Sequence, residues 1–515
     1  MREVVRRNKL FTGALAAGFV LRLLAVLGYP GALWFAGDSY VYLGAALRPQ
    51  PNLSKTTGYA WFLRLLLPFH SLTLVVAAQH LMGLADAVMI YALLRRASVS
   101  KKWATVAALP MLLDGYVIEN EHLIMTEALF TFCLMLALTI VLWWPKTSWW
   151  KALIAGLLLG YAAVVRTEGA IVLVIFPLFL LIRGWSWKTA GGWVSAICMC
   201  VGILVPVGAY ANWFHSRYGQ YGMTMSTGFY LWGRVSSFAD CARIHPTGDQ
   251  VKVCPTQPLT KRTPPGNYVW HAPQVHKNLN PTGGPVDPSN NSLLTSFAIH
   301  AVEAQPLDYA KTVVKNTLLT FGFPRIAYPG AGTTYYYSFH VHYKTSTYDM
   351  LPPDRKSHEW IKGGTAYSDW LSYGHEAPGV VHKVFAAPIL AYQRLIYTYG
   401  PLLAIIFLTG LGGVFAVRRR GWTARRAWDV RPLRIRWERR GTTMLPWITA
   451  VALVVFPIAI ADFDYRYLIP ALPFACAAAG LAFAPPRRPA PADTGPEGST
   501  GSAPETAPAV SDSVA

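Results

Sequence analysis

Ten apolar stretches, most of them long enough to cross a lipid bilayer, recur along this chain of 515 residues. A helix needs about 20 apolar residues to span the hydrocarbon core, and such runs are rare in soluble proteins. The composition agrees, because 53% of the residues are hydrophobic and only 14% are charged. We therefore predict an all-α polytopic membrane protein with about ten transmembrane helices. The predicted spans are residues 10–30, 71–94, 103–118, 123–144, 151–166, 169–183, 189–212, 386–416, 443–461 and 466–484.

The positive charge of the chain is explained by membrane topology. A formal net charge of +20 would suggest a nucleic-acid partner in a soluble protein. Here the basic residues lie in short loops between the spans, above all in residues 95–102 and 417–442. Basic loops face the cytoplasm, so we predict a multi-pass protein of the cell membrane with both termini cytoplasmic and no nucleic-acid partner. The apolar run at 10–29 is long enough to be the first span and is not predicted to be a cleaved signal.

The spans divide the chain into four parts. Residues 1–212 form an N-terminal transmembrane module with seven spans, and residues 386–484 form a C-terminal module with three. Between them, residues 213–385 are predicted to be an ordered extracytoplasmic domain of mixed structure, because they are rich in aromatic residues. Residues 485–515 are rich in Pro, Ala and Ser and are predicted to be a disordered cytoplasmic tail.

Only two cysteines, Cys241 and Cys254, fall outside the predicted spans, and both lie in the extracytoplasmic part. An exported pair of this kind predicts a disulfide in an oxidising compartment. No cysteine or histidine spacing typical of a metal site is present, so no metal ligand is predicted.

Acidic residues and arginines gather on the predicted outer face. Asp38 lies among aromatic residues, including Tyr40, just after the first span. A partly desolvated carboxylate there can accept a proton from a hydroxyl, while the alternative is an ordinary helix N-cap. Three more acids, Glu119, Glu121 and Glu127, follow the third span, and Glu127 lies inside the next helix, where an ionisable group is costly.

Two arginines break the charge rule by lying at the outer ends of spans. Arg166 is followed by Glu168, and Arg466 follows two aspartates near the end of the chain. A guanidinium suits bidentate binding of a phosphate, although a snorkelling or salt-bridged arginine is the alternative. Arg22 and Asp86 lie within the first two spans at different depths, so we do not expect them to pair with each other.

These motifs, in this order and on one side of the membrane, resemble the polytopic glycosyltransferases of the GT-C superfamily. The resemblance rests on Asp38, the aromatic Thr57-Gly58-Tyr59 stretch, Thr126-Glu127, Arg166 to Gly169, and Tyr465 to Pro470. It looks closest to the phospholipid-carrier-dependent branch that is related to protein O-mannosyltransferases and aminoarabinose transferases of lipid A. It covers residues 1–212 and 386–484.

The resemblance implies a GT-C-like fold and a transferase that takes a sugar from a polyprenyl-phosphate carrier. The acceptor would be an extracytoplasmic glycan, lipid or protein of the cell envelope. Asp38 would be the general base, and Arg166 and Arg466 would bind the donor phosphate. The remaining outer residues would contact substrate: Tyr40, Glu119, Glu121, Glu127 and Glu168.

Two questions stay open at this point. Many relatives carry a second acid directly after the first, whereas Ser39 follows Asp38, so no cofactor is certain and a divalent cation stays an option. The alternative function is a transporter or flippase of envelope lipids, which would use polar residues such as Arg22 and Asp86 at mid-membrane depth. A scaffold without activity would not require Arg166 or Glu127 at their positions.

Overall fold

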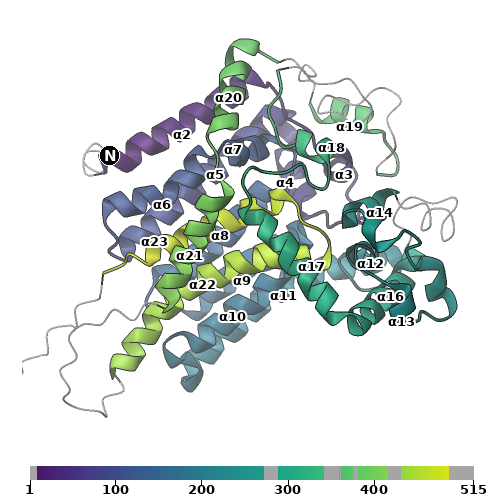
Figure 1. Cartoon of the computed structure of the whole chain (residues 1–515). Coiled ribbons are helices and arrows are strands. Elements are labelled where there is room, and N and C mark those ends of the chain that lie inside the picture. Colours follow the sequence, from purple (N-terminus) through teal and green to yellow (C-terminus); the bar gives the residue numbers. More distant parts are fainter. Residues whose placement is uncertain are drawn as a thin grey trace, which may run out of the picture. The chain divides into compact units, whose positions relative to one another are not determined.

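The computed structural model describes residues 8–271, 288–341, 359, 361–374, 381–415 and 431–485. Within these residues the regular elements are all helical, and none is a strand (Figure 1). The α-helices of the N-terminal part are α2 (Lys9–Gly28), α3 (Ala36–Leu47), α4 (Gly58–Leu66), α5 (Leu72–Arg96), α6 (Lys101–Leu113), α7 (Gly115–His122), α8 (Glu127–Trp143), α9 (Trp149–Val165), α10 (Val172–Ile182) and α11 (Ala190–Tyr218). Those of the remainder are α12 (Thr227–Ser236), α13 (Cys241–Ile244), α14 (Pro265–His271), α16 (Asn291–Ala304), α17 (Pro306–Leu318), α18 (Ala331–Tyr335), α19 (Ala366–Tyr373), α20 (Lys383–Leu395), α21 (Gly400–Phe415), α22 (Arg431–Ile460) and α23 (Leu468–Leu481).

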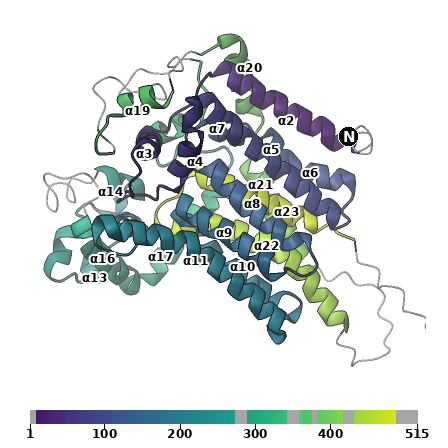
Figure 2. The same ribbon diagram turned by 180° about the vertical axis from the view of Figure 1, so that it is seen from behind.

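The predicted all-α membrane protein is confirmed. Among the described residues, four helical stretches are long and apolar enough to cross a bilayer by themselves: α2, α5, α11 and Thr442–Ile460 of α22. Shorter apolar helices run beside them, as Figures 1 and 2 show for α8, α9 and α10. Along α11, the side chains of Ile197, Val201, Leu204 and Val205 are exposed by 48% to 63%. An apolar face this exposed is suited to contact with lipid.

Two of the predicted spans are broken into separate helices. In the span predicted at 103–118, α6 ends at Leu113. The Asp114 side chain then accepts hydrogen bonds from the backbone amides of Tyr116 and Val117 and so caps the start of α7. The span at 386–416 is bent by 59° between α20 and α21. An aspartate in the capping position explains the first break, which apolar composition alone did not indicate.

Small residues allow α9 and α11 to pack closely. A Cβ atom added to Gly156 would lie 2.2 Å from the Met199 carbonyl oxygen, and one added to Gly160 would lie 2.4 Å from that of Ile203. This spacing of two glycines four residues apart is typical of helices that pack in membranes. It brings the outer end of α9, where Arg166 follows, against the rest of the bundle.

The described part of residues 213–385 is helical, so the mixed structure expected there is not seen. Helices α12, α14 and α16 share a hydrophobic core that includes Trp232 and Phe297. The Trp232 indole donates a 2.8 Å hydrogen bond to the Val253 carbonyl. Beside it Cys241 and Cys254 form a disulfide, with their Cα atoms 6.4 Å apart.

The rest of this part packs against other elements. Helix α17 contacts α22, and α19 contacts α3. Arg48 at the end of α3 binds the Asp369 carboxylate of α19 through two hydrogen bonds of 2.7 Å. All but the first residue of the tail expected at 485–515, and most of the basic loop at 417–442, lie outside the described residues.

Candidate active site

Asp38 lies in the first turn of α3, and the backbone fixes its position. Leu33 pairs with Leu123 in an isolated parallel bridge, with hydrogen bonds of 3.0 Å from Leu33 to His122 and from Ile124 to Leu33. The Ser39 hydroxyl accepts from the Phe35 amide at 2.8 Å and donates to the Ile124 carbonyl at 3.0 Å. Ser39 therefore ties the start of α3 to the segment that leads into α8.

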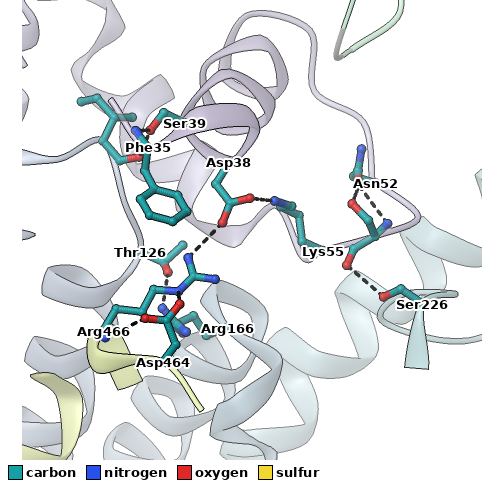
Figure 3. Close-up of polar contacts among 12 residues, drawn as sticks. Phe35, Asp38, Ser39, Asn52, Lys55, Thr126, Arg166, Ser226, Asp464 and Arg466 are labelled. Atoms are coloured by element: carbon teal, nitrogen blue, oxygen red, sulfur yellow. Dashed lines mark hydrogen bonds and ion pairs between the residues drawn. The ribbon is translucent and has the colours of Figure 1, made fainter. Parts of the chain in front are cut away.

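The Asp38 carboxylate is held between two cations (Figure 3). Its Oδ1 atom pairs with the Lys55 ammonium, and its Oδ2 atom accepts a 3.0 Å hydrogen bond from the Arg466 guanidinium. Phe35, and not Asp38, is the N-cap residue of α3. Burial by itself raises the pKa of Asp38, but the charges of Lys55 and Arg466 outweigh burial and hold that pKa well below the ordinary value. The carboxylate is therefore ionised over the physiological pH range.

Arg466 is oriented by its own helical turn. Asp464 caps the 3₁₀ turn Tyr465–Tyr467 by accepting from the Arg466 amide, and its Oδ2 atom lies 3.3 Å from the Arg466 Nε atom. Tyr337 donates a 2.7 Å hydrogen bond to the same carboxylate. The guanidinium also lies over the Phe35 ring, 4.9 Å from its centroid. Residues from three distant parts of the chain thus fix this one cation.

Arg166 is buried and already paired. It donates to Glu127, to the Thr126 hydroxyl at 3.1 Å and to Glu168 at 3.1 Å. The Tyr467 ring contacts both arginines, because the guanidinium carbons of Arg166 and Arg466 each lie 5.5 Å from its centroid. The structure therefore brings Asp38, Glu127, Glu168, Arg166 and Arg466 together at one end of the bundle.

Two predicted substrate contacts lie elsewhere. Glu121 is buried in α7, where it accepts hydrogen bonds of 2.8 Å and 2.7 Å from Arg22 and contacts His80 at 2.8 Å. It is thus the partner of Arg22, and Asp86 does not pair with that arginine. Tyr40 packs in the core against Trp34, with ring centroids 5.3 Å apart.

Glu119 is also buried, and it lines a pocket that includes Arg466. No group of three or more His, Cys, Asp or Glu residues that could hold a metal is found in the described residues.

Lys55 is the main site residue that the sequence reasoning missed. It lies in the segment between α3 and α4, where the Ser54 carbonyl accepts a 2.9 Å hydrogen bond from the Ser226 hydroxyl just before α12. Its ammonium lies 5.8 Å from the centroid of the Tyr42 ring. The available signal was the one that singled out Arg166, namely a basic residue on the outer side against the positive-inside trend.

Comparison with known proteins gives one family match. Residues 53–218 match the family model described as dolichyl-phosphate-mannose-protein mannosyltransferase. The matched segment begins just before Lys55 and ends with α11, and it contains Glu127 and Arg166. The comparison with curated proteins gave no significant match.

Solved structures show a distant likeness over most of the chain. Archaeal oligosaccharyltransferase AglB from Archaeoglobus fulgidus, in complex with an inhibitory peptide and a dolichol-phosphate, is 11% identical with a TM-score of 0.40, over 91% of this chain and 50% of that chain. The apo form of the Archaeoglobus fulgidus oligosaccharyltransferase is 11% identical with a TM-score of 0.39, over 92% of this chain and 50% of that chain. This chain spans about half the length of those proteins, and likeness at this level assigns no residue.

Proposed function

We propose that the protein is a membrane glycosyltransferase and that Asp38 is its general base. The match of residues 53–218 to the mannosyltransferase family model supports the activity that the resemblance implied. The donor is a sugar linked to a polyprenyl phosphate, and the acceptor is a hydroxyl of an envelope glycan, lipid or protein on the outer side of the membrane. Both termini are cytoplasmic in this proposal. The active site lies where α3, the outer end of α9 and the turn before α23 meet.

The observation that supports this proposal most strongly is the direct contact between Asp38 and Arg466. A carboxylate that can take a proton and a guanidinium that can bind a phosphate share one hydrogen bond of 3.0 Å. An acceptor hydroxyl beside Asp38 would therefore lie next to a phosphate beside Arg466. Such positioning of two reactants is a large part of what an enzyme contributes.

The reaction that suits this pair has few steps. The acceptor oxygen forms a bond to the anomeric carbon of the donor sugar while the bond between that carbon and the phosphate oxygen breaks. Asp38 accepts the hydroxyl proton, and the bonding electrons leave with the phosphate, which is stabilised by the guanidinium of Arg466. A phosphate leaves as an anion, so no strong acid is needed on the leaving side.

Arg166 is the second arginine proposed for the donor phosphate, but its donors face Glu127, Glu168 and Thr126. It contributes through the ring of Tyr467, which it shares with Arg466, and it binds phosphate directly only when one of its carboxylates turns away. In this proposal Glu127 and Glu168 therefore position Arg166 and do not bind the substrate directly. Glu121 has a positioning role. Its contacts with Arg22 and His80 hold α7, and the segment after α7 contains the Ile124 carbonyl that binds the Ser39 hydroxyl.

A transporter is the weaker alternative. Arg22, which would line a mid-membrane path, is neutralised by Glu121 and donates to the backbone carbonyls of Met111 and Leu112. A charge that is this fully satisfied has no capacity left for a passing substrate.

The proposed function is tested by incubating the purified protein with a panel of polyprenyl-phosphate-linked sugars and measuring consumption of the donor. We expect consumption that depends on an added hydroxyl acceptor and releases the polyprenyl phosphate. Transport of an intact lipid across vesicles, without any cleavage of the donor, would support the alternative.

A further inference from the structure

A pocket beside the Asp38 site contains a second arginine. Arg325 lines this pocket together with Arg466, and Asp38 does not. The Arg325 guanidinium is surrounded by aromatic rings, with its carbon 4.1 Å from the centroid of Tyr116, 4.9 Å from that of Tyr465 and 5.0 Å from that of Tyr397. No carboxylate pairs with Arg325 among the residues that the structure describes. Its charge is thus available to a ligand, unlike that of Arg166.

The loop that carries Arg325 is fixed in place. The next backbone amide, that of Ile326, donates a 3.0 Å hydrogen bond to the Tyr465 hydroxyl. Tyr465 and Arg466 are neighbours in the same 3₁₀ turn, so the two arginines approach the pocket from segments that are joined to each other. An ordered pair of guanidinium groups is the arrangement that proteins use for planar or tetrahedral anions.

Glu119 adds an unused hydrogen-bonding group to this pocket. Its side chain is only 1% exposed, and its Oε1 atom has no hydrogen-bond partner among the described residues. A buried polar atom without a partner is costly and is usually satisfied by something that binds. Burial also raises the pKa of Glu119 well above its ordinary value, which favours the neutral carboxyl. A neutral carboxyl can donate to a phosphate oxygen without repelling it.

Asp114 and Thr398 also line the pocket, and both oxygens of the Asp114 carboxylate accept hydrogen bonds from backbone amides, including one of 2.6 Å from Thr398. The apolar part of the lining comes from the membrane helices. Leu403 belongs to α21, and Leu468 and Leu472 belong to α23. The pocket has a volume of about 30 Å³, which is room for roughly two or three water molecules or for a group of similar size such as a phosphate.

We propose that this pocket binds the phosphate of a polyprenyl-phosphate lipid, with Arg325 and Arg466 as its two cations and Leu403, Leu468 and Leu472 against the first part of its chain. The assignment rests on the proposed function and adds Arg325 and Glu119 to its donor site. When the lipid phosphate carries a sugar, the phosphate lies on Arg466, and the anomeric carbon of the sugar can be directed toward Asp38.

The test measures binding, without turnover, to the purified full-length protein in lipid nanodiscs. Three probes are compared: a short polyprenyl monophosphate, inorganic phosphate and the matching polyprenol without phosphate. We expect the polyprenyl monophosphate to bind most tightly, because only it satisfies both the arginines and the apolar wall. Equal binding of inorganic phosphate would contradict the lipid assignment and indicate a site for free phosphate.

The variants locate the phosphate. In Arg325→Gln, affinity for the polyprenyl monophosphate should fall by about tenfold or more, the usual effect of losing a charge-assisted hydrogen bond. Arg325→Lys should show a smaller loss, because the charge remains and the planar fork does not. The lysine variant also keeps the proposal testable if Arg325→Gln does not fold. The matched control is Arg243→Gln, which removes an exposed arginine paired with Asp308 and should leave affinity unchanged.

The outcomes separate this proposal from the proposed function. If both Arg325 variants bind like the wild type while the wild type still binds and consumes donor, the pocket assignment is wrong and the transferase stands. If the wild type binds no polyprenyl monophosphate, both are wrong. Asp38→Asn should bind the polyprenyl monophosphate at least as tightly as the wild type in the same assay, because it removes the carboxylate that pairs with Arg466.

Discussion

Arg466 donates a 3.0 Å hydrogen bond to Asp38 across 428 residues of sequence. The contact joins the first outer helix to the turn before the last helix, and it makes the proposed base and the proposed phosphate ligand parts of one unit. The carboxylate is also paired with Lys55, so both of its oxygens are engaged by cations. A donor phosphate that draws Arg466 toward itself would free one of these oxygens for the acceptor hydroxyl.

Lys55 gives a prediction about pH dependence. Lys55 and Arg466 together hold the pKa of Asp38 below its ordinary value, so replacing Lys55 with Gln should move that pKa upward. The base works only when ionised, and kcat/KM falls as the pH drops through the pKa of the free enzyme's base. The acidic limb of the kcat/KM profile should therefore lie at higher pH in Lys55→Gln than in the wild type.

The control for this experiment is Lys252→Gln, which removes a lysine from an exposed pair with Asp249. Its profile should match that of the wild type. An acidic limb that stays at the same pH in Lys55→Gln would mean that Asp38 is not the titrating base.

Gly83 gives a prediction about stability. A Cβ atom at this position would lie 1.8 Å from the Glu121 Oε1 atom, so Gly83→Ala should break the buried contact between Glu121 and Arg22. Separating a buried ion pair typically costs about 3–5 kcal/mol. We expect a clearly lower apparent Tm in detergent.

Gly13→Ala is the matched control, because Gly13 is also helical and a Cβ atom there would have no atom within 4 Å. Alanine is favoured over glycine in a helix by roughly 0.5–1 kcal/mol, so this variant should be as stable as the wild type or slightly more stable. Equal Tm values for the two variants would show that the pair between Arg22 and Glu121 contributes little.

The disulfide predicts a redox effect that is confined to the helices around it, α12 to α16. Cys241 and Cys254 are 13 residues apart, and closing such a loop is worth about 3 kcal/mol in the chain-entropy account. Replacing both cysteines with Ser should therefore increase proteolysis within residues 227–304 and leave the membrane helices intact. Mass spectrometry of the unreduced protein provides the direct check, and free thiols at both positions would refute the linkage.

Much of the architecture was predictable because a bilayer leaves a strong mark on composition. The apolar spans indicated a helical membrane protein, and several of the acids and arginines singled out at span ends do lie together at one end of the bundle. Helix ends were harder, since the break at Asp114 depends on one capping side chain. The pair of Arg22 and Glu121, which are 99 residues apart, depends on how the helices pack.

Within the site, too, the sequence indicated which residues matter but not how they pack. Asp38 and Arg466 were singled out by charge on the outer side, but sequence could not indicate that they touch. Tyr40 was expected to contact substrate, yet it lies two positions after Asp38 on a helix and so points away from it, toward Trp34. Tyr42, four positions after Asp38, is the tyrosine that shares its face of α3. Periodicity could have made this distinction had the segment been recognised as helical.

The measurement that tests the central claim most directly is the transfer rate of Asp38→Asn with a polyprenyl-phosphate-linked sugar. Asparagine keeps the size and most of the hydrogen bonding of aspartate and removes its basic oxygen. Our account predicts that turnover falls on the order of 10²–10⁴-fold, the usual contribution of a positioned base, while expression, Tm and binding of the polyprenyl monophosphate persist. A variant that keeps most of its transfer rate would contradict the account and exclude Asp38 as the base.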